Sequence, residues 1–522
     1  MTKATCIATT VFLLAFAYNA VEAQQSFVPS KYASYYQDGS TAKVKPLEIA
    51  APKIQGTKLE AHPSVTAPSS SQDSVISKRE PATSKQDPMP STQDHASGSD
   101  SKHEEVVDCG CEVPEKKEEK KKEDEPVEYS LSYKKGFLIA PKDKEKSPYS
   151  LRINGRSQFR YAGFSPDADT FTNQGGTIDL ESQSGFEIER ARIEFRGFFI
   201  NENLTYYFNL DGDTDDNHQI IFHDFWVDYR ISDLFNIRVG KAKVPASYEW
   251  LESSSTTRFA DRSVSTTFFR ADRSTGVWFF GESKENNFYW QTAIVNGFVA
   301  TDLDQGDIDD VFSYAGLAYW DPLGDFGKGH SDIKHTKDLK LRFGISGAFS
   351  NQNPFADGSN TEEVGFAQIS DGTDLVAPGA LGAGLTVNNF DLYLVSLFSS
   401  GKYRGWSWNS EFYARWLQDI ETIEGPVPVD NKLFDSGFYT DVGYTIVPNK
   451  FEVIGRISNV DGLFGDAWEY AGGANWFLNG THKHKITFDA TILDGNPSSS
   501  SSPNFSVGQN GVLYRLQYQA AF

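Results

Sequence analysis

Arginines recur at alternate positions in several short segments of this chain. This spacing places their side chains on one face of an extended strand, because successive side chains of a strand point to opposite sides. The candidates on strands are Arg152, Arg156, Arg160, Arg190, Arg192, Arg196 and Arg238, and a later segment adds Arg258, Arg262, Arg270 and Arg273. Aligned guanidinium groups select anions electrostatically. The pattern therefore favours binding or passage of small anions.

Acidic residues on the same faces leave a second interpretation open. Glu194 lies between Arg192 and Arg196, and Asp224 and Asp228 occur in a neighbouring segment. If these carboxylates pair with the arginines, the arginines stabilise the fold and give no net preference for anions.

Patterns for other chemistry are weak. We find no nucleophile elbow, P-loop, zinc-protease motif or dinucleotide-binding motif in a suitable context. We therefore expect no enzyme activity, no catalytic residue and no cofactor. The run from Asp211 to Asp216 resembles the start of a Ca²⁺ loop, but its twelfth position is Phe222 and not Glu. We expect no specific metal site, although loose binding of divalent cations by acidic loops stays open.

Alternation of apolar and polar residues dominates the chain after residue 147. In Val512–Phe522 the apolar side chains fall at every second position and end on an aromatic residue, and Leu151–Tyr161 follows the same pattern. Segments of about ten alternating residues between turns are typical of membrane-barrel strands. Tyr518 and Phe522 are the candidate barrel-terminal signal.

The pattern predicts an all-β fold, a transmembrane antiparallel up-and-down β-barrel of about sixteen strands after a disordered N-terminal extension. Short turns alternate with long loops, except at the long connection 321–337. An arginine facing lipid near mid-membrane would cost roughly 2–4 kcal/mol, so the arginine faces should point into the lumen. The predicted strands lie near 150–163, 185–199, 203–210, 219–230, 234–243, 275–283, 287–297, 312–320, 338–349, 386–398, 405–417, 433–447, 450–458, 467–478, 484–493 and 511–522.

The first 147 residues have a different composition. Residues 1–23 resemble a secretory signal, with Lys3 followed by a short apolar run. Residues 24–147 are rich in Ser, Pro, Lys and Glu, which predicts a disordered, charged periplasmic extension. Cys109 and Cys111 lie within it, in a structural or cross-linking role that stays open. The barrel domain is expected over 148–522.

The net charge of −22 belongs almost entirely to the barrel region, since residues 1–147 sum to −2 and the remainder to −20. The predicted long loops, apart from 244–274, hold about 25 Asp and Glu and, of the basic residues Lys and Arg, only Lys432. The loop 244–274 carries the four later arginines instead and is a candidate constriction loop, which would fold inward and narrow the pore. Such acidity argues against nucleic-acid binding.

Several segments resemble the phosphate-selective porin O and P family. The resemblance covers most of 148–522 and rests on ERARIEFRGFF (189–199), FNIRVGKAKVPASYEWLESSS (235–255), FADRS (259–263), RSTGVWFFG (273–281), GFYTDVGYTIVPNKFEVIGRISNVDG (437–462), GANWFLNGTHKHKI (473–486) and YRLQYQAAF (514–522). It implies a sixteen-stranded trimeric barrel that passes small anions such as phosphate or polyphosphate. The acidic outer loops and the long N-terminal extension depart from the family pattern.

The expected location is the bacterial outer membrane. The expected partners are small anionic or general hydrophilic solutes, the lipid bilayer, the barrel-assembly machinery and two further copies of the chain. Two alternatives remain at this level: a structural or surface-interaction barrel with cation-binding acidic loops, and a soluble secreted β protein that acts on carbohydrates.

Overall fold

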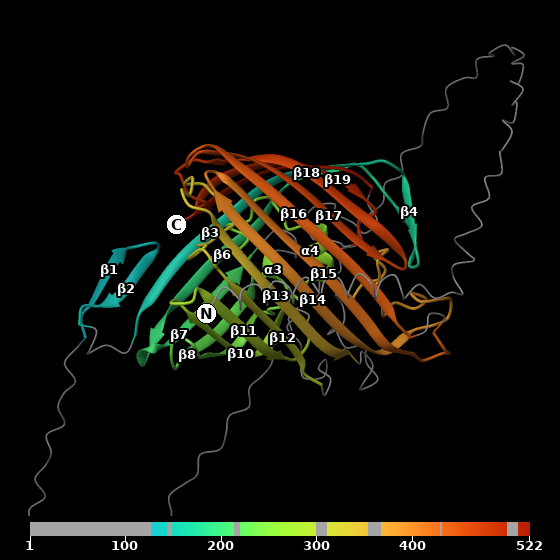
Figure 1. The fold of residues 1–522 in the computed structure, drawn as a ribbon, viewed down its shortest axis with the longest axis horizontal. Helices are drawn as coiled ribbons and strands as arrows, with labels where there is room; N and C mark the ends of the chain where they lie inside the picture. The colour runs from blue at the N-terminus through green and yellow to red at the C-terminus, as the bar shows by residue number, and fades with distance from the viewer. Residues whose placement is uncertain are drawn as a thin grey trace, which may run out of the picture. The chain divides into compact units, whose positions relative to one another are not determined.

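The structure, a computed structural model, describes residues 127–143, 149–212, 220–298, 311–352, 367–427, 431–497 and 510–522. Sixteen antiparallel strands pair in chain order, and β20 pairs with β3 to close the barrel (Figure 1). The strands are β3 (Leu151–Pro166), β6 (Gln183–Phe199), β7 (Asn201–Asp211), β8 (Ile221–Arg230), β9 (Asn236–Lys243), β10 (Arg273–Ser283), β11 (Phe288–Val295), β12 (Ser313–Trp320), β13 (Lys340–Gln352), β14 (Val387–Tyr403), β15 (Trp406–Thr422), β16 (Leu433–Val447), β17 (Phe451–Gly462), β18 (Gly465–Phe477), β19 (His484–Asp494) and β20 (Gly511–Ala521).

Every one of the sixteen predicted segments coincides with a barrel strand, so the predicted fold class is confirmed. The two faces of β3 show why the alternation was informative. Phe159 and Tyr161 are exposed on the outer face, whereas Gln158 and Arg160 are fully buried inside. Apolar side chains on the outer face suit contact with lipid. In the described part of the chain, neither helix has the length and apolar character needed to cross a membrane.

A hairpin precedes the barrel in a region where we expected disorder. Strands β1 (Tyr129–Tyr133) and β2 (Phe137–Pro141) pair with each other, and β2 continues onto the first residues of β3. The turn is possible because Gly136 adopts a φ of 119°. Phe137 packs edge-on against Phe522, with ring centroids 5.8 Å apart. The prediction of disorder is wrong for these residues. The signal segment, Cys109, Cys111 and the rest of the extension lie outside the described residues.

A smaller hairpin, β4 (Thr170–Asn173) and β5 (Gly176–Asp179), lies within the long loop between β3 and β6. The barrel-terminal residues Tyr518 and Phe522 are both partly exposed. The backbone N–H of Phe522 donates to the carbonyl of Gly155 at 3.0 Å, which ties the chain end to β3.

The segment between β9 and β10 lies inside the lumen and contains two short helices, α3 (Tyr248–Leu251) and α4 (Val264–Phe269). The first N–H groups of a helix have no partner within the helix. Glu411 on β15 accepts from the N–H groups of Tyr248 and Glu249 at 2.8 and 3.0 Å, and Glu469 on β18 accepts from Val264 at 2.8 Å. Carboxylates of the barrel wall thus cap both helices of this segment, which we call the inward segment (244–272).

A second segment enters the lumen from the end of the barrel that carries the short turns. It is the connection 321–339, the one that broke the predicted alternation of loop lengths. Arg258 of the inward segment donates to the carbonyl of His330 at 3.1 Å, and it also pairs with Asp441 and Glu452 on the wall. The two segments therefore meet inside the barrel at one buried guanidinium.

Asp261 holds the inward segment to another part of the wall, formed by β20, β3 and β6. Its carboxylate lies 3.0 Å from Arg160 on β3, 2.9 Å from Arg515 on β20 and 3.7 Å from Arg190 on β6. Burial alone would raise the pKa of Asp261, but Arg160 and Arg515 hold it well below its usual range. A carboxyl group with a depressed pKa stabilises the folded state above its unfolded pKa of about 3.9 and loses that effect only at lower pH. The attachment therefore persists in mildly acidic solution.

The variant Asp261→Asn tests this attachment. We expect the free energy of unfolding to fall by about 3 kcal/mol, because buried arginines would lose a shared counter-charge. We also expect a larger single-channel conductance, since the inward segment would be held less tightly. Urea unfolding of the detergent-solubilised barrel and planar-bilayer recording measure the two effects. Asp338→Asn, at an exposed position of 321–339, is the control. Native stability and conductance in the Asp261 variant would contradict this assignment.

Candidate functional site

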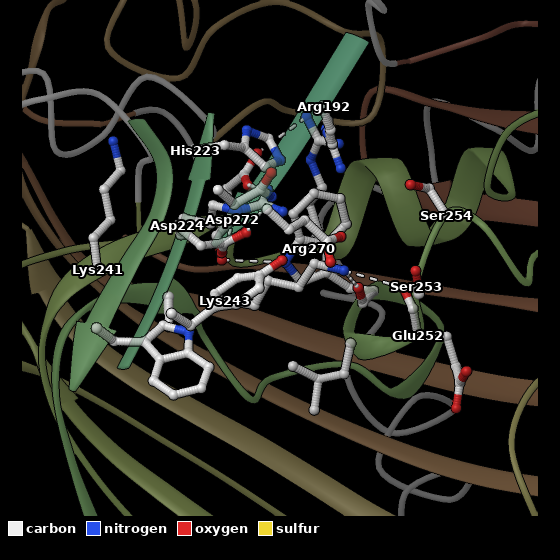
Figure 2. Close-up of a pocket in the computed structure, with 18 of the residues that line it drawn as sticks. Arg192, His223, Asp224, Lys241, Lys243, Glu252, Ser253, Ser254, Arg270 and Asp272 are labelled. Carbon is white, nitrogen blue, oxygen red and sulfur yellow. Dashed lines mark hydrogen bonds and ion pairs between the residues drawn. The ribbon is translucent and has the colours of Figure 1, made fainter. Parts of the chain in front are cut away.

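Two adjoining cavities lie between the inward segment and the wall formed by β3 and by β6 to β13. We call them the inner cavity, of about 870 Å³, and the vestibule, of about 1360 Å³. Tyr207, Trp226 and Tyr289 line both cavities, which therefore adjoin at these residues. The turn residues Lys284 and Asn287 line the vestibule and place it toward the end with the short turns. Figure 2 shows the inner cavity, with Arg192, His223 and Asp224 on one side and Ser253 and Ser254 on the other.

Two β-bulges determine which side chains face the inner cavity. The pairing of β3 with β6 shifts between Gln158 and Phe159, which leaves Glu189 as an extra residue. The pairing of β7 with β8 shifts in the same way and leaves His223 as the extra residue. A bulge lets two successive residues point to the same side. Glu189 therefore lines the cavity beside Arg190, and His223 lines it beside Asp224.

Sequence reasoning missed Glu189 and His223 as lumen residues. The signal was present, because each forms a pair of successive polar residues that interrupts an otherwise regular alternation. Tyr207, Tyr289 and Tyr319 were also missed as cavity residues, although each lies on the lumen face of its predicted strand.

Nine of the eleven candidate arginines line one of the two cavities. Arg160 and Arg258 do not, and this corrects their assignment as pore-lining and constriction residues. Both are buried, with exposed fractions of 0% and 1%, because the inward segment covers one and contains the other. The residues in the inner cavity are Arg156, Arg190, Arg192, Arg238, Arg262, Arg270 and Arg273, and those in the vestibule are Arg152 and Arg196.

Most of these arginines are paired with carboxylates, as the second interpretation of the sequence allowed. The pairs include those with the three acidic residues named from the sequence. They are Arg190 with Glu189 at 2.7 Å, Arg192 with Asp211 at 2.6 Å, Arg196 with Glu194, Arg238 with Asp228 at 2.7 Å, Arg270 with Asp272 at 3.3 Å, and Arg273 with Asp224 at 3.0 Å. The positive charge of these arginines is therefore partly cancelled by the carboxylates beside them.

Two cations of the inner cavity are held by backbone carbonyls. Lys243 donates to the carbonyls of Trp250 and Glu252 at 2.6 and 3.0 Å. Arg262 donates to the carbonyls of Glu249 and Glu252 at 3.1 and 2.8 Å. The last carbonyls of a helix lack partners within the helix and attract cations. Among the described residues neither cation has a carboxylate within 4.0 Å, so these bonds orient the two groups without cancelling their charge.

The position of Arg262 makes its positive charge costly. Burial and the nearby Arg190 lower the pKa of Arg262 to about 9, which leaves the group charged at neutral pH. Its charge would be better accommodated with an anion beside it.

Like charges also face each other across β3 and β6. Arg156 lies directly opposite Arg192 in the register, and Arg152 lies opposite Arg196. Within the described residues, Arg152 and Arg156 have no ion pair. Like charges directly opposite each other destabilise a sheet. The arrangement therefore adds positive potential to the lumen at a cost to stability.

Four cations surround the indole ring of Trp250, and we call this group the Trp250 cluster. Lys243 lies 4.9 Å from the ring centroid, Arg262 4.5 Å, Arg270 4.6 Å and Arg273 5.4 Å. An aromatic face attracts a cation and so offsets part of the repulsion between the four. Among the residues that the structure describes, two carboxylates, Asp224 and Asp272, are paired with members of the cluster. The cluster therefore keeps a net positive charge.

The two cavities differ in charge. Eleven basic and six acidic residues line the inner cavity, whereas five of each line the vestibule. A solute that enters from the vestibule thus passes from a balanced surface to a positive one. Among the described residues no group of three or more potential ligands forms a metal site. Asp211 pairs with Arg192, and the other acidic residues of the Ca²⁺-like run lie outside the described residues.

Solved structures of outer-membrane proteins resemble this fold at low sequence identity. They include OmpT of Vibrio cholerae (10% identity, TM-score 0.42), OmpF of Salmonella typhi in complex with daunomycin (12%, 0.44) and the outer-membrane channel DcaP of Acinetobacter baumannii (8%, 0.43). Each comparison covers 72% of this chain and 98% of the other. A comparison with curated proteins gives no match.

Residues 161–520 match the family described as phosphate-selective porin O and P. The match covers β4 to β19 completely, the last six residues of β3 and all but the last residue of β20, and it confirms the resemblance found in the sequence. The chain therefore belongs to the phosphate-selective porin O and P family and is a bacterial outer-membrane porin for small solutes.

Proposed function

We propose that this porin is a water-filled diffusion channel that favours small anions, among them phosphate and polyphosphate. The observation that carries the proposal is the Trp250 cluster, in which Lys243 and Arg262 line the inner cavity and, among the described residues, are bound by neutral carbonyls and by no carboxylate. Preorganised cations in a narrow, partly desolvated passage act on a passing ion more strongly than the same charges in bulk water. The family relationship supports the same class of solute.

The variant with Lys243→Gln and Arg262→Gln tests the proposal. In a KCl gradient across a planar bilayer, the native channel should show a reversal potential of the sign for chloride preference. A unit charge about 10 Å away at an effective dielectric constant of about 50 attracts chloride and repels potassium by about 0.7 kcal/mol each. The permeability ratio of chloride to potassium should therefore fall about tenfold for each charge removed.

Lys450→Gln is the matched control, because it removes one positive charge from an exposed turn outside both cavities. It should leave the permeability ratio unchanged. Potassium preference in the native channel would refute the proposal.

Arg156 and Arg160 lie four residues apart on β3 and should respond differently to neutralisation. Arg156→Gln should lower anion preference and leave the barrel stable, since this arginine has no ion pair among the described residues. Arg160→Gln should cost about 3 kcal/mol of stability, because the carboxylates of Glu189 and Asp261 would each lose one of the arginines that surround them. Bilayer recording and urea unfolding distinguish the two outcomes. Equal loss of stability in both variants would contradict the distinction.

We further propose that the barrel is a homotrimer, with residues 1–23 as its secretory signal and residues 24–126 in the periplasm. The family resemblance supports the trimer, and the barrel-terminal residues Tyr518 and Phe522 support recognition by the barrel-assembly machinery. Light scattering of the native detergent complex should give three chains per particle. A single chain per particle would overturn the trimer.

A further inference from the structure

Aromatic and guanidinium side chains follow one another along the lumen wall at the boundary of the two cavities. On β6 to β10 the run consists of Arg196, Tyr207, Trp226, Arg238 and Phe280, one residue on each strand. Adjacent members are in contact: Arg196 with Tyr207 at 5.2 Å, Tyr207 with Trp226 at 5.1 Å, and Arg238 with Trp226 and Phe280 at 3.7 and 5.2 Å.

The next three strands continue this pattern. Tyr289 on β11 stacks on Tyr319 on β12, with ring centroids 5.0 Å apart, and Arg342 on β13 lies 3.9 Å from the ring of Tyr319. We call the two runs together the aromatic belt. It contributes one residue from each of eight neighbouring strands, and most of its members line the inner cavity.

The aromatic belt is electrically balanced. Each of its guanidinium groups is paired with one carboxylate: Arg196 with Glu194, Arg238 with Asp228 at 2.7 Å, and Arg342 with Asp321 at 2.8 Å. The belt therefore offers flat, polarisable surface without net charge. Planar solutes stack on aromatic rings and on guanidinium planes.

The positive charge lies elsewhere in the same cavity. The Trp250 cluster retains uncancelled charge at Lys243 and Arg262, and both residues line the inner cavity together with Tyr289 and Tyr319. A cavity of about 870 Å³ lies within the range of about 300–1,000 Å³ that holds organic ligands. An inorganic oxyanion bound at the cluster would leave the aromatic surface uncovered.

We propose that the inner cavity binds organic anions that carry a planar ring. The anionic group lies at the Trp250 cluster, and the ring lies against Tyr289 and Tyr319 of the aromatic belt. This inference rests on the proposed anion preference and specifies its substrate class. A neutral sugar would stack on the same rings, but it would leave the charge of Lys243 and Arg262 uncompensated.

Phenyl phosphate and methyl phosphate test the inference, because they carry the same charged group and differ in the ring. Each is added to a planar bilayer that contains the full-length channel in KCl, and its half-blocking concentration is measured. Stacking of one ring is worth about tenfold in affinity, so phenyl phosphate should block at about one-tenth of the methyl phosphate concentration. Benzyl alcohol, which has the ring without the charge, should not block in this range.

The variant with Tyr289→Leu and Tyr319→Leu should bring the half-blocking concentration of phenyl phosphate close to that of methyl phosphate. Its preference for chloride over potassium is recorded in the same bilayer, because that preference reports the charges of the Trp250 cluster independently of the ring. Tyr470→Leu on the outer face, where the side chain is 46% exposed, is the matched control and should keep the tenfold difference. The heat-induced shift in gel mobility verifies that each variant has folded.

Two results would overturn the inference, and both are read on the native channel and so do not depend on folding of a variant. Equal block by phenyl phosphate and methyl phosphate would show that the cavity does not bind the ring. Block by benzyl alcohol at the phenyl phosphate concentration would show that binding does not require the anionic group. In either case chloride preference in plain KCl would leave the proposed function standing. Potassium preference there would refute the proposed function and this inference together.

Discussion

The interior of this barrel depends on the burial of one charged segment against a wall of opposite charges. Moving an ion pair out of water costs several kcal/mol for each ion, and the cost is recovered only when partners and hydrogen bonds are complete. Asp261 meets this condition through Arg160 and Arg515, and Glu411 meets it by capping α3. Because the segment is fixed against part of the wall, the open passage is confined to the space between the segment and the wall formed by β3 and by β6 to β13. The location of the cavities follows from the location of these ion pairs.

The same constraint divides residues of one type into two roles. Arg160 and Arg156 share a face of β3, yet the first lies under the inward segment and the second faces the inner cavity. The strand alternation that places both in the lumen is a local property, and it predicted all sixteen strands and the lumen face of the arginines. Which arginine is covered depends on contacts with residues about 100 positions away, such as Asp261. No local pattern contains that information, so the sequence alone could not separate structural arginines from those in the passage.

Local irregularities account for the other differences between expectation and structure. At Glu189 and His223 an extra residue exchanges the inward and outward positions of the strand. In the sequence, each bulge is marked by two successive polar residues, Glu189–Arg190 and His223–Asp224. The hairpin of β1 and β2 was missed for a different reason. Its first strand, Tyr129–Tyr133, alternates clearly and its second, Phe137–Pro141, is a short apolar run. The composition of the preceding hundred residues is that of a disordered chain, however, and an average over a long window conceals a short ordered element.

The net charge of the whole chain and the charges that line the cavity act differently on a passing ion. The net charge of −22 would suggest a channel that repels anions. At physiological ionic strength, however, exposed charges are screened over about 8 Å, whereas partly buried charges are screened much less. Acidic groups on the predicted outer loops should therefore lose most of their influence before an ion reaches the inner cavity. Lys243 and Arg262, held by carbonyls beside the passage, act over a few ångströms at low local dielectric. Under the proposed anion preference, these two side chains would therefore contribute more to the sign of the selectivity than the much larger charge outside.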